Sequence, residues 1–156
     1  MSASATPGPS SRAPGDRATT APASGTLAFG RTRAYEDGLE VTVSAPRPFT
    51  PSRGAAGHSP GNRAVVLDVK VRNGSGDRIA LDGVVVRARD GEGRELSAVF
   101  DAEPPPVLGL HGALLPGRQA VASYGFDLPA TARSALEVEV KVGFDQDSDF
   151  WSGPLP

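Results

Sequence analysis

Three aspartates near the C-terminal end have the spacing most suggestive of a chemical site. Asp145, Asp147 and Asp149 alternate along the chain, as do the first three oxygen ligands of an EF-hand calcium loop. Phe150 stands where such a loop needs a glycine at its sixth position, and a hard cation requires six or more oxygen ligands. We therefore expect a solvated loop here, with a weak calcium site at Asp145, Asp147 and Asp149 as the alternative.

The other reactive side chains form no catalytic or metal-binding motif. The chain has two histidines, His58 and His111, and neither has a partner at a recognisable metal-ligand spacing. It has no cysteine, which excludes thiolate nucleophiles and thiolate metal sites. Its G-x-S-x-G match, residues 57–61, stands in a Pro/Gly-rich loop, whereas a serine nucleophile of this type sits on a strand-to-helix turn. The sequence thus predicts no catalytic residues, no cofactor-binding residues and no cofactor, and a protein that is not an enzyme.

The clearest structural signal is the segment 63–73, which reads RAVVLDVKVRN. Its period of two predicts a half-buried β-strand. The expected inward row is Val65, Leu67, Val69 and Val71, and the expected outward row is Val66, Asp68, Lys70 and Arg72. A slip of one residue would bury three charged side chains, so the strand has a single acceptable register.

Four further segments repeat this alternation. Their expected inward rows are Leu39, Val41, Val43 and Ala45; Val84, Val86 and Ala88; Ala120, Ala122, Tyr124 and Phe126; and Leu136, Val138, Val140 and Val142. Pro46 and Pro48 are expected to end the first of these strands. The turn at residues 90–93 should pair the second with residues 94–100 as a hairpin.

No apolar stripe of helical period persists along the chain, so the sequence predicts an all-β domain. Short strands with turn signals between them favour an Ig-like, or telokin-like, antiparallel β-sandwich of about seven to eight strands. Residues 26–156 should form this domain. Residues 1–25, rich in Ser, Thr, Pro and Ala, should form a disordered linker or tail because they offer too little apolar surface to bury.

Loops between the strands carry two further signals. Residues 47–62 are rich in proline and glycine and are expected to form a long mobile connection. Asn73-Gly74-Ser75 matches an N-glycosylation sequon, but an Asn-Gly pair also makes an ordinary turn between strands. We favour the turn.

Charge and hydropathy limit the partners. With 16 basic and 18 acidic residues and a net charge of -2, the chain lacks the basic surface that nucleic acid requires. No apolar run is long enough to cross a bilayer, and the first residues lack a signal-peptide core. We expect no nucleic acid partner, no membrane insertion by this chain itself, and any signal or anchor to be missing from it.

Two sets of side chains, one aromatic and one of arginines, allow either a binding or a structural interpretation. One set of aromatics could form a surface platform or close one end of the sandwich, and comprises Tyr35, Phe49, Phe144, Phe150 and Trp151. Closure is favoured because large aromatics mostly bury. A set of alternating arginines could form a basic strip or a solvated face, and comprises Arg31, Arg33, Arg87 and Arg89. We favour the solvated face.

Four segments in order carry a family resemblance. They are FGRTRAYEDGLEVTVSAPRPFTPS from Phe29, VVLDVKVRNGSG from Val65, LLPGRQAVASYGFDLP from Leu114, and LEVEVKVGFDQDSDFWSG from Leu136. Together they resemble the DUF4352 group of actinobacterial exported proteins, which is similar in fold to a mycobacterial secreted immunogenic β-sandwich protein. The resemblance implies an extracytoplasmic domain, often tethered by a lipid or a single helix behind a low-complexity linker, and brings no catalytic residues with it.

These observations predict a non-enzymatic, extracellular or cell-surface β-sandwich module that binds or displays, with a protein or cell-envelope component as partner. The alternative is an accessory domain that binds a small molecule or a metal with loops at one end of the sandwich. A concave pocket with convergent polar groups would favour the alternative. A flat face with exposed apolar residues would favour a protein partner.

Overall fold

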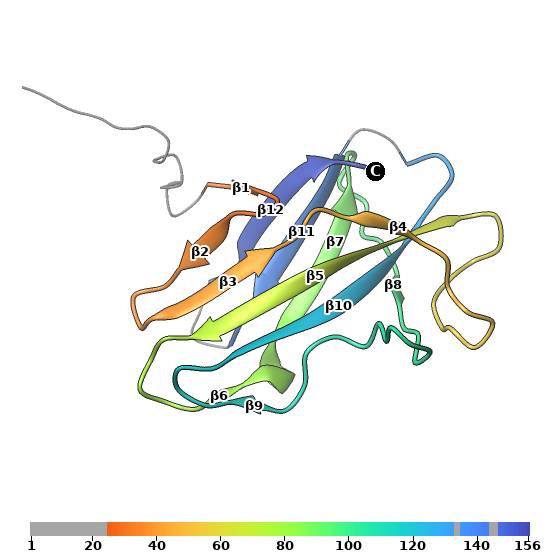
Figure 1. Ribbon diagram of the computed structural model, residues 1–156. Helices are drawn as coiled ribbons and strands as arrows, with labels where there is room; N and C mark the ends of the chain where they lie inside the picture. The colour runs from red at the N-terminus through yellow and green to blue at the C-terminus, as the bar shows by residue number, and fades with distance from the viewer. Residues whose placement is uncertain (1–24, 133–134, 144–146) are drawn as a thin grey trace, which may run out of the picture.

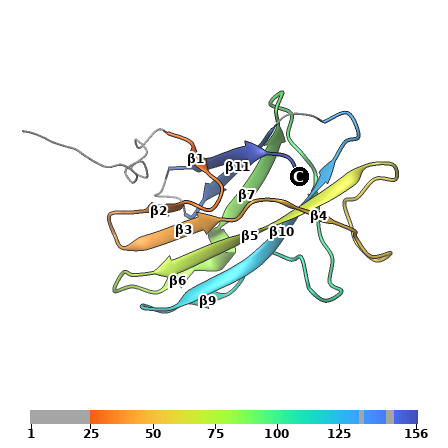
Figure 2. The same cartoon turned by 45° about the horizontal axis from the view of Figure 1, so that its top comes forward.

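The computed structural model describes residues 25–132, 135–143 and 147–156. This part of the chain forms twelve strands in two packed sheets and one small two-stranded sheet. Figures 1 and 2 show the two layers from different sides, with β5 and β10 in one and β7 and β11 in the other. The all-β sandwich expected from the sequence is confirmed. The predicted linker, residues 1–25, lies outside the described residues except for Gly25.

The larger sheet has the order β2-β3-β5-β10-β8, with β4 also paired to β5, and all its pairs are antiparallel. Its strands are β2 (Thr32–Ala34), β3 (Leu39–Val43), β4 (Arg47–Phe49), β5 (Arg63–Asn73), β8 (Ala98–Val99) and β10 (Gln119–Leu128). The long β5 and β10 are central, and ten residues of each pair along their length.

The smaller sheet has the order β1-β12-β11-β7. Its strands are β1 (Leu27–Ala28), β7 (Val85–Asp90), β11 (Ala135–Lys141) and β12 (Asp149–Pro154). β1 pairs with β12 in parallel, whereas the other pairs are antiparallel. A short ribbon of β6 (Ile79–Ala80) and β9 (Ala113–Leu114) and a single 3-10 turn, η4 (Leu81–Gly83), lie at one end of the sandwich.

The core lies between the sheets and is made by the inward rows that the alternation predicts. On β5 the four predicted inward residues are at most 1% exposed. Leu67 pairs with Tyr124 and Val65 with Phe126, which places the rows of β5 and β10 on the same face. Leu136, Val138, Val140 and Val142 face them from the other sheet and are likewise buried.

A β-bulge corrects the prediction that Pro46 and Pro48 end the second strand. β3 pairs Val43 with Val69, and β4 then resumes on the same edge of β5 by pairing Arg47 with Val66. Four residues on one side therefore match three on the other, which is the count of a bulge. The extra residue reverses the alternation, so Ala45, expected inward, is exposed and Pro46 is buried.

The expected hairpin of residues 84–89 with 94–100 forms only at its turn. Arg89 bridges Glu95, and the Leu96 N–H donates to the Ala88 carbonyl at 2.8 Å. The chain then crosses to the other sheet, where β8 pairs with β10. The second arm thus joins the two sheets at this edge instead of extending one of them.

A second apolar cluster on the outer face of the larger sheet explains why Val66 is buried and not solvent-facing as predicted. Val66 is 7% exposed, and Val99 and Val107 are buried as well. Val66 pairs with Gly125, and a Cβ at Gly125 would lie only 3.0 Å from Val107 Cγ1. The bare backbone of Gly125 lets residues 98–107 pack on this face and cover it.

The Asn73-Gly74-Ser75 segment is a structural turn. The Asn73 side chain is 0% exposed. Its amide nitrogen donates to the carbonyls of Asp77 and Leu114 at 2.7 and 2.9 Å, and its oxygen accepts from the Ser75 N–H at 3.0 Å. A sugar on this amide would replace one of its two N–H donors and would need space that a fully buried side chain does not have, so the turn interpretation fits the structure.

Candidate functional site

A cavity of about 680 Å³ lies at the end of the sandwich that holds β6 and η4. Its apolar wall is made by the start of β3, by β6, by the start of β7 and by the residue after β11. The side chains that form this wall are Leu39, Ile79, Ala80, Val85 and Val142. Leu39 and Val142 belong to the core, whereas Val85 is 45% exposed. The cavity therefore opens from the core toward solvent.

Five charged side chains also line this cavity, and they come from four places in the chain. Asp37 lies in the turn before β3, Arg78 directly before β6, Arg87 on β7, and Glu139 and Lys141 on β11. The pairing of β7 with β11 places Arg87 opposite Glu139 and Val85 opposite Lys141. Two rigid strands thus position three of the five charges.

The two acidic groups of the cavity already have partners. Asp37 Oδ1 accepts the Leu39 N–H at 3.0 Å. Glu139 lies 3.3 Å from Arg89 Nη2, and Arg89 also reaches Glu137 at 3.8 Å. The carboxylate of Glu139 is therefore shared with a guanidinium other than that of Arg87.

The predicted calcium ligands fall into a different setting. Asp145 lies outside the described residues. Asp149 is buried, with Oδ1 3.0 Å from Arg33 Nε and Oδ2 accepting the Tyr35 hydroxyl at 2.6 Å. Burial, reinforced by this hydrogen bond, raises the pKa of the Tyr35 phenol, which keeps it a donor. Arg33 lies on β2 of the larger sheet and Tyr35 directly follows β2, whereas Asp149 begins β12 of the smaller sheet. These contacts therefore link the two sheets.

Asp147 is exposed and lines a shallower hollow with Asp149, Glu36 and Asp37. Even so, the described residues contain no group of three or more His, Asp or Glu side chains arranged to hold a metal ion. The calcium alternative at Asp145, Asp147 and Asp149 stays a prediction.

His58 and the buried Asp101 and Asp127 have structural partners. His58 Nδ1 lies 2.8 Å from Asp127 Oδ1, and Asn62 Nδ2 donates to the other oxygen of Asp127 at 2.7 Å. Asp101 accepts the N–H and the hydroxyl of Ser52, each at 2.7 Å. The connection 47–62, expected to be mobile, thus begins with β4 at residues 47–49 and is attached at two further points. His111 is exposed and does not line the cavity.

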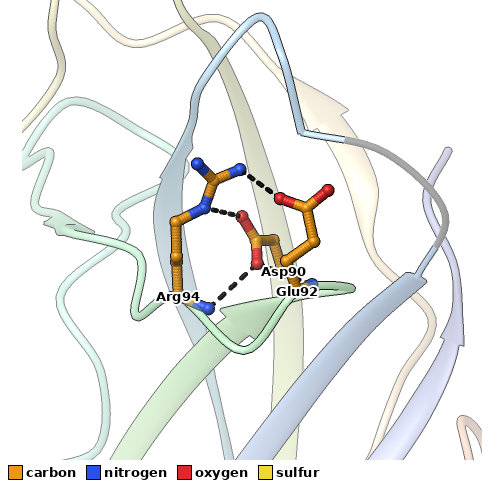
Figure 3. Close-up of polar contacts among 3 residues, drawn as sticks. All are labelled: Asp90, Glu92 and Arg94. Carbon is orange, nitrogen blue, oxygen red and sulfur yellow. Dashed lines mark hydrogen bonds and ion pairs between the residues drawn. The ribbon is translucent and has the colours of Figure 1, made fainter.

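Another buried aspartate, Asp90, organises the turn after β7. Figure 3 shows Asp90 accepting the Arg94 N–H at 3.0 Å and facing Arg94 Nε at 3.0 Å, while Arg94 Nη2 donates to Glu92 at 2.7 Å. Burial acts to raise the pKa of Asp90, but the backbone N–H groups of Arg94 and Glu92 outweigh it and hold the pKa below the ordinary 3.8. The N–H and hydroxyl of Ser52 lower the pKa of Asp101 in the same way.

These two lowered pKa values predict a loss of stability in acid. A carboxylate with a depressed folded-state pKa stabilises the native state fully above its unfolded value, here 3.8, and that contribution is lost as pH falls through the folded-state pKa. We expect the urea concentration at the midpoint of unfolding to decrease as the pH is lowered below 3.8. In an Asp90→Asn, Asp101→Asn variant the midpoint should be lower at pH 7 and fall less steeply in acid. An equally steep acid loss in that variant would contradict the assignment.

The aromatic and arginine sets are resolved by burial and sheet membership. Trp151 is fully buried, Tyr35 packs against the core, and Phe49 and Phe150 are half-buried, whereas Phe144 lies outside the described residues. Arg33 is on β2 of the larger sheet, whereas Arg87 and Arg89 are on β7 of the smaller one. The arginines therefore do not form one strip, and the aromatics that the structure describes do not form an exposed platform.

The cavity itself has no sequence signature. Arg78, Arg87 and Lys141 are separated by 9 and 54 positions along the chain, and each follows a local pattern typical of a solvated strand or loop. Only the pairing of β7 with β11, and the fold of β6 beside them, brings these side chains to one site.

Within the described ranges, no helix has the length and apolar character needed to span a bilayer. The sequence matches no protein-family model and no curated protein. It resembles solved structures of several bacterial proteins. The YjhA protein of Bacillus subtilis has a TM-score of 0.66 at 14% identity, with 81% of this chain and 98% of that chain covered.

Two further structures carry information on cellular setting. The secreted protein MPT63 of Mycobacterium tuberculosis has a TM-score of 0.57 at 17% identity, covering 82% of this chain and 96% of that one. A lipoprotein candidate of Bacillus subtilis, YcdA, has a TM-score of 0.62 at 13% identity, covering 79% of this chain but 38% of the other. The chain thus shares its fold with β-sandwich domains of secreted and lipoprotein-like bacterial proteins.

Proposed function

We propose that this chain is a non-enzymatic, extracytoplasmic module of a bacterial secreted or cell-surface protein that binds a small molecule in its end cavity. The cavity carries this proposal. Its volume of about 680 Å³ falls within the roughly 300–1,000 Å³ of typical ligand sites, which combine an apolar lining with a few polar groups. This is the arrangement that favours the accessory-domain alternative over a flat display surface.

The composition of the cavity supports binding rather than catalysis. Ser148 is the only hydroxyl-bearing side chain among the described lining residues, and neither histidine lines the cavity. A serine nucleophile needs a base within hydrogen-bonding reach. The extracytoplasmic setting is supported by the likeness to a secreted protein and a lipoprotein candidate, and the resemblance to the DUF4352 group of actinobacterial proteins is part of the same proposal.

Display to a protein partner is a second candidate, favoured by one observation. Phe100 and Leu108 are each 51% exposed and directly flank the bridge between Asp101 and Val107. Exposed apolar neighbours of this kind are typical of protein-binding surfaces. The role would be that of the module expected from the sequence, with a protein or cell-envelope component as partner.

Nuclear magnetic resonance can test cavity binding. We expect at least one member of a panel of small carboxylic acids, phosphates, amines and sugars to shift the amide signals of Ile79, Val85 and Val142 saturably. Val85→Trp should abolish the effect by filling the cavity from an exposed position. Val121→Trp is the matched control, because Val121 is an exposed valine, 57% exposed, on the other sheet.

Two outcomes would count against the proposal. One is a panel that leaves the three cavity amides unshifted. The other is a Val85→Trp variant that binds as well as the Val121→Trp control. Shifts confined to Phe100 and Leu108 on addition of envelope proteins would favour display instead.

A further inference from the structure

The cavity holds three cationic side chains that have no anionic partner. Among the described residues, the side chains of Arg78, Arg87 and Lys141 form no ion pair or hydrogen bond, although all three line the cavity. Arg89, the other cation on β7, is paired with Glu137 and Glu139. The cavity thus brings three unpaired cations to one concave site.

The two carboxylates that line the cavity form no ion pair with these cations. Arg87 lies opposite Glu139 in the strand register, the position in which opposite charges normally pair across a sheet. The carboxylate of Glu139 nevertheless reaches Arg89 at 3.3 Å. Asp37 is occupied by the Leu39 N–H of its own turn. Three cations thus line the cavity against two carboxylates, and concave walls of low dielectric strengthen the field of such an excess charge.

The apolar wall of the same cavity limits the class of anion. Leu39 and Val142 are 2% and 5% exposed and lie at the core side, whereas Val85 stands 45% exposed beside the cations. A small inorganic anion would leave most of about 680 Å³ empty. A ligand that covers the apolar wall and reaches the cations must carry both an apolar body and an anionic group.

We propose that the cavity binds an amphipathic anion, in which an apolar body packs on Ile79, Val85 and Val142 while a carboxylate, sulfonate or phosphate group is held by Arg78, Arg87 and Lys141. This inference rests on the proposed ligand-binding function and specifies its ligand class. Arginine offers a planar fork of donors that matches such oxyanions, and lysine adds a point charge. Binding of this kind transfers no atoms, so the site is one of recognition alone.

Two fluorescent probes with the same apolar body separate charge from apolarity. Anilinonaphthalene sulfonate carries the anionic group, and phenylnaphthylamine is the same body without it. We expect saturable binding of the sulfonate. The neutral probe should have a dissociation constant at least about tenfold higher, because it lacks one good charged interaction. Each of Arg78→Gln, Arg87→Gln and Lys141→Gln should weaken the sulfonate several-fold and leave the neutral probe unchanged.

Matched controls keep the result specific to the cavity. Lys70→Gln and Arg53→Gln remove exposed cations elsewhere and should leave both probes unaffected, while Val85→Trp should displace both probes. Equal affinity for the two probes, with no effect of the three cavity variants, would overturn the anion inference. The proposed ligand binding would still stand if Val85→Trp abolished the binding of both probes. Binding of the sulfonate that Val85→Trp does not alter would overturn the inference outright, and the amide-shift panel would then decide the proposed function separately.

Discussion

Replacing Trp151 by alanine is expected to lower the free energy of unfolding by about 3–5 kcal/mol, the range for removing a buried aromatic and leaving a cavity. Trp151 is 0% exposed and is the largest fully buried side chain. It sits on β12 between its register neighbours Leu27 and Val138, and its Nε1 donates to the Arg31 carbonyl at 2.9 Å. The side chain thus joins the smaller sheet to the segment that leads into β2.

Urea unfolding followed by far-ultraviolet circular dichroism would measure this change, because the variant loses the only tryptophan of the chain. Phe100→Ala is the control: it also removes an aromatic, but one that is 51% exposed, and should change stability by about 0.5 kcal/mol or less. If the variant does not fold, Trp151→Phe should fold with reduced stability. Equal stability of Trp151→Ala and Phe100→Ala would show that the core does not depend on Trp151.

The second large effect concerns β5, the longest strand. Leu67→Ala should cost about 2–5 kcal/mol through lost burial and the cavity left behind, because Leu67 is 0% exposed and opposes Tyr124 across the central pair of strands. Lys70→Ala, three positions along on the exposed face, should stay within about 0.5 kcal/mol. Urea midpoints of the two variants provide the comparison, and a tolerant Leu67 beside a sensitive Lys70 would mean that the register of β5 is inverted.

Asp68 is not an equivalent control, although it shares the outer face with Lys70. Its carboxylate accepts the Ser123 hydroxyl at 2.7 Å and lies 3.3 Å from Arg47 Nη1. Its backbone N–H donates to Ser44 Oγ at 2.9 Å, within the bulge between β3 and β4. Asp68 therefore helps to hold the irregular edge of the larger sheet, which a period-of-two pattern does not predict.

The candidate binding site is built mainly from the regular part of the fold. Arg87 and Lys141 stand on paired strands, and Leu39 begins a third. Side chains on such elements are positioned before a ligand arrives, so less ordering entropy is lost on binding. The opposite end of the sandwich differs, because residues 50–62 are held there by contacts with Asp101 and Asp127. Acid should weaken the attachment of Ser52 there, because protonation of Asp101, whose pKa is lowered by the N–H and hydroxyl of Ser52, removes the charge that these groups stabilise.

The sequence alone predicted the all-β class, the register of β5 and the inward rows of β10 and β11. Each of these follows from side-chain alternation, which is a local property: the pleat sends neighbouring residues to opposite faces, and burial of Leu67 or Val138 then selects the face. Among the described residues, the burial of Trp151 followed from the same tendency of large apolar groups to bury. None of these predictions required knowledge of which strands are neighbours.

Tertiary structure decided what depends on contacts between distant segments. The bulge before Pro46, the burial of Val66 beneath residues 98–107 and the crossing of the chain after Leu96 all arise from how loops pack on sheets already formed. The cavity has the same origin. In the sequence, the cavity cations Arg78, Arg87 and Lys141 each have the pattern of a solvated charge. They come together only because β6, β7 and β11 meet at one end of the sandwich, where Glu139 pairs with Arg89 instead. Long-range pairing, which leaves no periodic trace in the chain, brings these charges together.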